Sequence, residues 1–155
     1  MTSNIVLTLT IPPSANRMWA TRVVTPKGKK PMAMTYLTPE AKSYKADVAA
    51  AALVAGVRAP LPGRVKVEIW FYPNRPQDWK TRIRKFGPEW DNGVMAPDLD
   101  NLTKPLLDSL KDICFGDDKM VFQLVSKRME PDDKGARVVV RITPIVVETK
   151  QETLL

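Results

Sequence analysis

The segment DLDNLTKPLLDSLKDICFGDDKMVFQLVSKR, residues 98–128, decides how this chain folds. Its first half places apolar residues at the spacing of one helical face, which predicts a helix ending near Cys114. These apolar residues are Leu102, Leu106, Leu110 and Ile113. Because proline beyond the first turn removes a helical hydrogen bond, Pro105 favours a helix start closer to Lys104. After the turn that contains Asp117 and Asp118, residues 120–128 are expected to form a strand.

Four further elements are predicted on either side of this segment. Residues 5–11 alternate apolar and polar side chains as a strand does, and the pattern stops at Pro12. Thr38-Pro39-Glu40 is a helix start, and that helix should end by Gly56. Residues 64–72 and 136–143 are expected to be strands. The order β-α-β-α-β-β indicates one α/β (α+β) domain over residues 1–143, with a mixed sheet packed with two main helices, and a loose tail over 144–155.

Composition narrows the possible functions. The chain has 155 residues, 44% of them hydrophobic, and a net charge of +7, which favours one globular domain with a polyanionic partner. An ordinary basic domain is the plain alternative.

Histidine is absent, so hydrolases and nucleases that use a catalytic or metal-binding His are excluded. The single Cys114 excludes a disulfide framework and is expected to be a core residue. With no signal peptide and no apolar run long enough for a membrane span, a cytoplasmic protein is expected.

Two basic segments are candidates for contact with DNA. Residues 17–30 hold five basic side chains and no acidic one, and with their proline and glycine they predict a mobile cationic loop. The basic residues there are Arg17, Arg22, Lys27, Lys29 and Lys30.

Residues 74–97 are expected to form a long polar loop with a second basic set. That set is Arg75, Lys80, Arg82, Arg84 and Lys85, interleaved with Trp79, Phe86 and Trp90. Basic side chains contact phosphates and aromatic rings stack on bases, so the loop suits unpaired or distorted DNA. A lid whose aromatic rings pack back onto the body is an equally good interpretation.

The acidic residues are concentrated in one region of this basic chain. Seven of the 17 acidic residues lie between Asp91 and Asp118. In extended backbone Asp98 and Asp100 would point the same way, and a chain folding back after the helix could bring Asp117 and Asp118 beside them. Three or four such carboxylates form an oxygen site for Mg²⁺ or Mn²⁺.

A bound ion of this kind activates water and stabilises charge on phosphate, and Lys104 could offset that charge too. Each aspartate alone is as easily a helix cap or a turn residue, and Asp108 and Asp112 are expected on a solvated helix face. The clustering, the missing histidine and the basic surroundings together favour a metal-dependent phosphodiesterase.

These motifs resemble the RusA family of Holliday-junction resolvases. The pattern DLDNLxKxxxDxL begins at Asp98, DDxxV begins at Asp117, and PPSxNR begins at Pro12. The resemblance spans roughly residues 5–143. It implies a homodimeric, Mg²⁺-dependent endonuclease, with no organic cofactor, that makes paired nicks across a four-way DNA junction.

By motif position, the resemblance implies catalytic roles for four residues. These are Asp98, Asp100, Asp118 and Lys104, and the three aspartates together with Asp117 are the expected metal ligands. Asn16 and Arg17, in the first motif, join the basic residues expected to contact DNA. The alternatives are a non-catalytic basic DNA-binding module and a metal nuclease acting on other branched DNA or on RNA.

Overall fold

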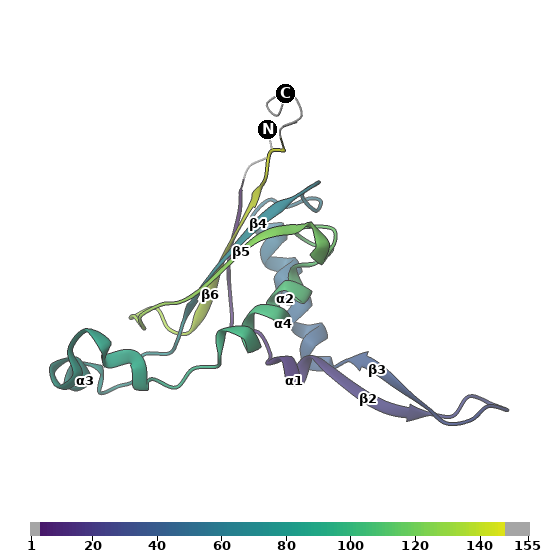
Figure 1. Cartoon of the computed structure of the whole chain (residues 1–155), viewed down its shortest axis with the longest axis horizontal. Helices are drawn as coiled ribbons and strands as arrows, with labels where there is room; N and C mark the ends of the chain where they lie inside the picture. The colour runs from purple at the N-terminus through teal and green to yellow at the C-terminus, as the bar shows by residue number, and fades with distance from the viewer. Residues whose placement is uncertain (1–3, 148–155) are drawn as a thin grey trace, which may run out of the picture.

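The centre of the molecule is a mixed four-stranded sheet, seen in a computed structural model that describes residues 4–147. The strand order is β1-β6-β4-β5, where β1 and β5 are the edges (Figure 1). Strand β6 is antiparallel to both β1 and β4, and β4 is parallel to β5. The strands are β1 (Ile5–Leu9), β4 (Val65–Tyr72), β5 (Val121–Arg128) and β6 (Arg137–Pro144).

Alternating side chains give this sheet one buried face. In β4 the residues Val65, Val67, Ile69 and Phe71 are at most 2% exposed, while the residues between them are only partly buried. The long helices α2 (Pro39–Val54) and α4 (Leu99–Leu110) cover that face, and the opposite face is open (Figure 1). The predicted single domain with a mixed sheet is therefore confirmed.

Helix α2 begins where its sequence predicts. The Thr38 hydroxyl accepts a hydrogen bond from the Ala41 amide at 3.2 Å, and Pro39 occupies the first helical position. The buried Tyr44 hydroxyl donates to the Thr10 carbonyl at 2.7 Å and fixes the helix to the end of β1. Burial raises the pKa of this phenol far above its ordinary value.

Helix α4 tolerates an internal proline, so the expected start near Lys104 is wrong. The helix begins at Leu99 and ends at Leu110, with Pro105 in its interior and fully buried. The proline removes one helical hydrogen bond, but its ring packs in the core, as Leu106 and Leu110 do. Cys114 follows in a turn rather than in the helix, and it is buried as expected. This burial raises the pKa of its thiol to about 11.

Residues 17–30 do not form the expected loop. After the short helix α1 (Ala15–Met18), strands β2 (Trp19–Val24) and β3 (Met32–Leu37) form an antiparallel hairpin with its turn at residues 25–31. Backbone pairing explains the error, because the proline and glycine that suggested a loop belong to the turn. The hairpin extends away from the sheet (Figure 1).

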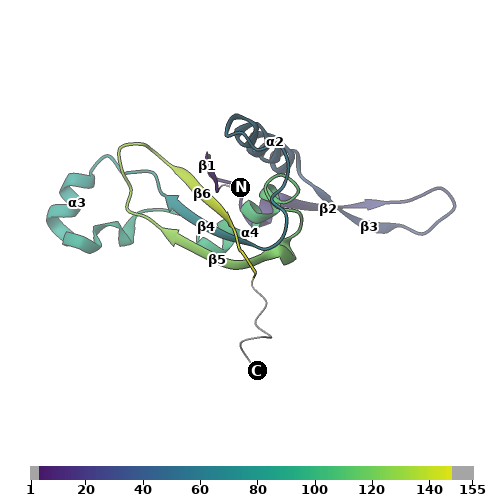
Figure 2. The ribbon, with the colours of Figure 1, turned by 90° about the horizontal axis from the view of Figure 1, so that it is seen from above.

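Residues 74–97 are also more ordered than expected. They contain helix α3 (Trp79–Phe86) and the 3-10 helix η1 (Gly87–Gly93), which pack on each other. Seen from above, this α3–η1 unit and the hairpin extend in opposite directions from the sheet and its helices (Figure 2).

Two further expectations concern the ends of the chain and the membrane. Strand β6 ends at Pro144, and residues 148–155 of the expected loose tail lie outside the described residues. Among residues 4–147, no helix has both the length and the apolar character needed to cross a membrane.

Candidate metal and DNA-binding site

The first two candidate metal ligands lie at the beginning of α4. Asp98 is the N-cap residue and has the extended backbone expected, whereas Asp100 is in the first helical turn and does not. Both are exposed, and the Asp98 carboxylate does not cap the helix. Within residues 4–147 neither forms an ion pair, which leaves their oxygens available to a cation.

Lys104 lies on the same side of α4 as Asp100. The two residues are four apart, so they are neighbours on the helix surface. Lys104 is exposed and forms no salt bridge with the described residues. Its ammonium group can therefore meet a phosphate that approaches the carboxylates.

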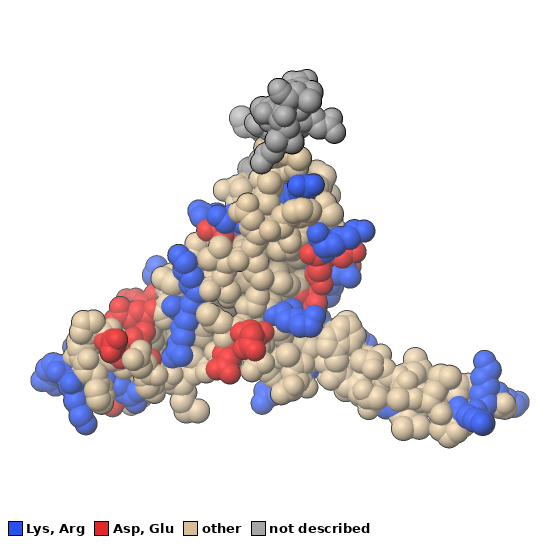
Figure 3. Space-filling view, in the orientation of Figure 1, with Lys and Arg blue, Asp and Glu red and all other residues tan. Residues whose placement is uncertain are grey.

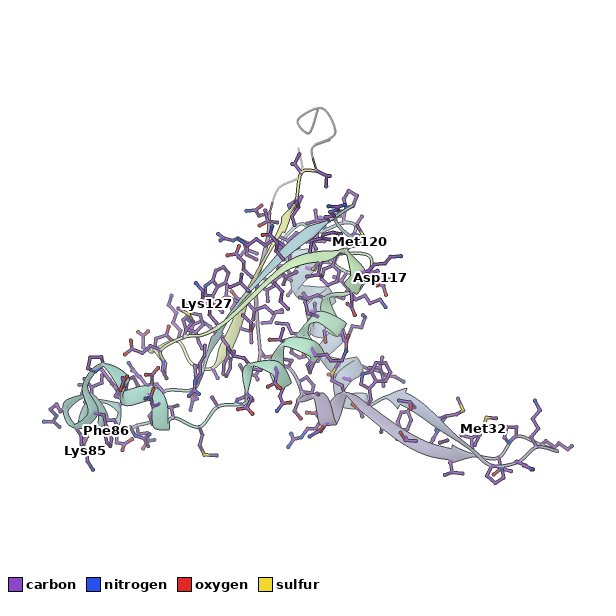
Figure 4. All side chains as sticks on the ribbon, in the orientation of Figure 1. Met32, Lys85, Phe86, Asp117, Met120 and Lys127 are labelled. Carbon is purple, nitrogen blue, oxygen red and sulfur yellow. The ribbon has the colours of Figure 1, made fainter. Side chains whose placement is uncertain are left out.

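Asp117 and Asp118 lie beyond the opposite end of α4. They stand at the start of η2 (Asp118–Met120), directly before β5, and Figure 4 shows Asp117 beside that strand's first residues. Asp117 accepts a hydrogen bond from the Lys119 amide at 3.3 Å, whereas Asp118 is exposed. A 12-residue helix is about 18 Å long, so Asp118 is far from Asp98.

The four candidate carboxylates therefore do not meet within one chain. Within the described residues, no group of three His, Cys, Asp or Glu side chains could hold a metal ion. The expectation that the chain folds back to bring them together is wrong, because the 12 residues of α4 separate Asp98 from the turn that precedes Asp117. The donors at each end still suit a hard cation, since all are carboxylate oxygens.

A hollow connects the first sequence motif to this site. It has a volume of about 550 Å³ and lies between the segment before α1, one side of α2 and the residue before Asp98. Its lining includes Pro12, Pro13, Ser14, Arg17, Glu40, Asp47 and Pro97. Asn16 and Arg17 are both exposed next to it. The distance from the Arg17 Nη1 atom to the Glu40 Oε1 atom is 3.9 Å. The PPSxNR motif thus lies near the candidate carboxylates at the beginning of α4.

The basic side chains of the hairpin are exposed. Lys27, Lys29 and Lys30 are in its turn, and the Arg22 guanidinium lies 5.3 Å from the centre of the Tyr36 ring. Arg22 is on a strand, so it is held in a defined direction. All four remain candidates for phosphate contact.

In the α3–η1 unit the candidate DNA-binding residues differ in whether their charged groups already contact another side chain. Lys80, Arg84 and Lys85 are exposed on α3. Arg82 donates to the Asp78 carboxylate at 2.9 Å, and the Arg75 guanidinium lies 4.2 Å from the centre of the Trp79 ring. The Lys80 and Lys85 ammonium groups also lie 5.5 and 5.2 Å from the centres of the Trp79 and Phe86 rings, but both side chains are exposed. Together with Arg84 they are the best placed for DNA.

Of the aromatic residues in this unit, one is exposed, as stacking on DNA bases requires, and another packs back onto the rest of the protein. Phe86 is 57% exposed, and Figure 4 shows it with Lys85 at the outer end of the unit. Trp90 is 4% exposed, and its indole N–H donates to Glu130 at 2.7 Å, so it packs back onto the body. Arg128 also anchors the unit, by donating to the carbonyl of Val94 at 2.8 Å. Sequence reasoning missed these two anchors, because contacts between distant residues leave no local pattern.

Charges on the surface follow the shape of the molecule. Figure 3 shows acidic patches over the beginning of α4 and over the inner part of the α3–η1 unit, and basic patches beside the first of these and at the outer ends of the α3–η1 unit and of the hairpin. A polyanion bound along this side would contact both ends and pass the carboxylates in the middle.

Comparison with known families identifies the chain. No curated protein sequence gives a match. The family model described as Endodeoxyribonuclease RusA matches residues 10–143, which include all three motifs. This match confirms the resemblance and excludes the non-catalytic binding module. The chain belongs to the RusA family, and it is a metal-dependent endodeoxyribonuclease that acts on Holliday junctions in DNA recombination and repair.

Proposed function

We propose that the chain acts as a homodimer that uses Mg²⁺, or Mn²⁺ in its place, to make paired symmetric nicks across a four-way DNA junction. In this proposal each of two metal sites combines Asp98 and Asp100 of one subunit with Asp118 of the partner subunit, where Asp117 is an additional candidate ligand. The cytoplasm, where bacterial or phage DNA is found, is the proposed location.

One observation supports this proposal: the 12-residue helix α4 keeps the candidate carboxylates at its two ends apart. Asp98 and Asp118 flank a helix of 12 residues, so one chain offers two carboxylates at one end and two at the other. Two carboxylates with no third acidic neighbour make a weak cation site, since hard cations take six or more oxygen ligands. A second subunit that supplies the missing carboxylate would complete it.

Strand β5 offers an interface that would do this. It is an edge of the sheet and pairs only with β4, so its outer edge has no strand partner among residues 4–147. Phe122 and Leu124 are 53% and 45% exposed on it. A long edge strand with exposed apolar side chains is prone to pair with another strand. A two-fold dimer would use the same strand of both subunits.

Antiparallel pairing of two β5 strands would bring the right residues together. Helix α4 runs antiparallel to β5 (Figure 1), and the Thr103 and Ser126 hydroxyls are 2.9 Å apart between them. The beginning of α4, with Asp98, therefore lies toward the end of β5, while Asp118 precedes its first residue. In an antiparallel pair the start of one strand lies beside the end of the other. Asp118 of the partner subunit would thus approach Asp98 and Asp100.

The chain's own residues would divide the reaction between them. Asp98, Asp100 and Asp118 of the partner subunit would hold the ion, which when bound supplies an activated water and neutralises phosphate charge. The carboxylates would otherwise repel the DNA backbone. Lys104, beside Asp100, would stabilise the negative charge that develops on the attacked phosphate.

The basic residues would hold the junction across this site. We assign phosphate contacts to Asn16 and Arg17 at the hollow and to the basic residues of the two projecting parts. Those are Arg22, Lys27, Lys29 and Lys30 on the hairpin, and Arg75, Lys80, Arg82, Arg84 and Lys85 near or on α3. Their positions at both ends of the surface that carries the carboxylates support this assignment (Figure 3).

A cleavage assay tests the proposed function. A labelled four-way junction, a duplex, a flap and single strands are each incubated with the protein, with Mg²⁺ and with EDTA. We expect symmetric nicks in the junction alone, only with the metal, and loss of both nicks in Asp98→Asn. Equal cleavage of the flap, or of an RNA strand incubated in parallel, would show that the substrate assignment is wrong.

A further inference from the structure

The β2–β3 hairpin does not pack against the four-stranded sheet or its helices along most of its length. It forms a two-stranded sheet of its own, and its residues are exposed or only partly buried. It joins the body at its base, where the Thr38 amide donates to the Met18 carbonyl at 3.0 Å. An isolated two-stranded hairpin is only marginally stable in water. A partner that covers it would therefore stabilise it.

Both faces of the hairpin carry exposed apolar side chains, beside Arg22 on one face and Thr21 and Thr35 on the other. The strand register places Arg22 opposite Met34 and Val24 opposite Met32, so these side chains share one face with Tyr36. Val23 is on the other face and is 72% exposed, while Met32 and Met34 are 47% and 45% exposed. Phosphate contact alone requires no such surface. The exposed apolar residues indicate that the hairpin is buried against something larger.

Charge decides between the candidates for that partner. From Ile5 to Pro39 the sequence has no acidic residue, and the turn of the hairpin carries Lys27, Lys29 and Lys30. A second copy of this chain, with its net charge of +7, would repel the lysine-bearing turn. DNA attracts it, and its grooves also present sugars and base edges to apolar side chains.

The dimensions agree with a DNA groove. Strands of six residues reach about 20 Å, and the major groove of B-DNA, about 12 Å wide, admits a two-stranded β-ribbon. Narrower ribbon tips and apolar wedges are used in the minor groove, where they separate base steps and bend the duplex. Figure 4 shows Met32 in the outer part of the hairpin, well away from the body.

We infer that the β2–β3 hairpin enters a groove of one duplex arm of the junction, with its lysines on the phosphates and its apolar residues against sugars and bases. The inference rests on the proposed function only in taking branched DNA as the substrate. It deepens that proposal by naming an insertion into the groove, in addition to contact with the backbone.

The test attaches a cleavage reagent to the turn. Lys29→Cys is coupled to an iron chelate through its thiol, and the buried Cys114, whose pKa is raised to about 11, stays unlabelled in the folded protein. The labelled protein is bound to a four-way junction without Mg²⁺, and radical cleavage of the DNA is mapped. We expect cuts confined to a few nucleotides on both strands of one arm, with an offset between strands that identifies the groove.

Because the mapping needs no Mg²⁺, it separates this inference from the nuclease assignment, which the cleavage assay tests. Diffuse cuts along every arm would overturn the inference, as would radical cleavage of the polypeptide of a second subunit instead of DNA.

Substitutions of the apolar residues provide an independent measurement. Met34→Thr and Val23→Thr keep a side chain suited to a strand but remove apolar surface. Each should weaken junction binding about tenfold, because a half-exposed side chain of this size loses its burial against the DNA. Val6→Thr, on edge strand β1 and 54% exposed, is the matched control and should leave binding unchanged. Unchanged binding in Met34→Thr and Val23→Thr, with circular dichroism like that of the wild type, would overturn the inference.

Discussion

Removing the free positive charges of α3 should change the salt dependence of junction binding by a calculable amount. Lys80, Arg84 and Lys85 are exposed on α3, and Figure 4 shows Lys85 in the outer part of the molecule. If each contacts one phosphate, the variant with all three changed to Gln loses three contacts. The slope of log K against log salt then falls by about 2.7, because each contact contributes about 0.9. Between 50 and 200 mM salt, the loss of affinity should be about 40-fold smaller than in the wild type.

The measurement is a gel shift with a four-way junction in EDTA at several salt concentrations. A variant with Lys66, Lys127 and Lys134 changed to Gln has the same net charge, and Lys66 and Lys127 lie on the open sheet face. It controls for long-range attraction and should keep the slope of the wild type. Arg82→Gln should lower the slope by less than the 0.9 of one full phosphate contact, because the Arg82 guanidinium is already partly neutralised by Asp78. Equal slopes for the α3 variant and the wild type would refute the assignment of α3 to DNA contact.

Three further changes test other parts of the account. Lys104→Ala should lower the cleavage rate by orders of magnitude and leave binding in EDTA nearly intact, whereas Asp108→Asn, on the same helix, should cleave normally. A thiol reagent should label Cys114 only in denaturant, because the thiol is buried and its pKa is raised to about 11; fast labelling of the native protein would contradict this. Asp132 has a pKa lowered to about 2 by its hydrogen bond from Arg137, so its stabilising effect is present above pH 4 and is lost as the pH falls toward 2. Denaturant unfolding of Asp132→Asn should therefore match the wild type near pH 2 and show lower stability at pH 7.

The sequence predicted those parts of the fold that depend on local patterns. The alternation in residues 65–72 and the cap at Thr38 each specify one element, and both elements formed as expected. Pro105 led to a wrong prediction of the start of α4. The hydrogen bond that a proline removes from a helix can be read from the local sequence, whereas the burial of its ring in the core depends on the whole fold. The hairpin and α3 were missed because charged and turn-forming residues suggested loops, and backbone pairing overrode them.

The candidate site shows the same limit. The motifs nominate the candidate carboxylates, because the spacing within each motif is local. They could not show that α4 separates Asp98 from Asp118, since this depends on the direction of the chain after Leu110. The anchoring of Trp90 by Glu130 is likewise a contact over 40 residues, which no window of sequence contains.

The central claim, that each metal site draws on both subunits, is tested most directly by mixing two inactive variants. Asp98→Asn and Asp118→Asn are each expected to be inactive alone, and their subunits are exchanged by mild denaturation and refolding. If the sites are shared, each mixed dimer has one site with both substitutions and one intact site. About half of the dimers should be mixed, and these should nick one strand of the junction with Mg²⁺ present. A mixture that stays inactive, although mass spectrometry shows mixed dimers, would mean that each site is built within one chain.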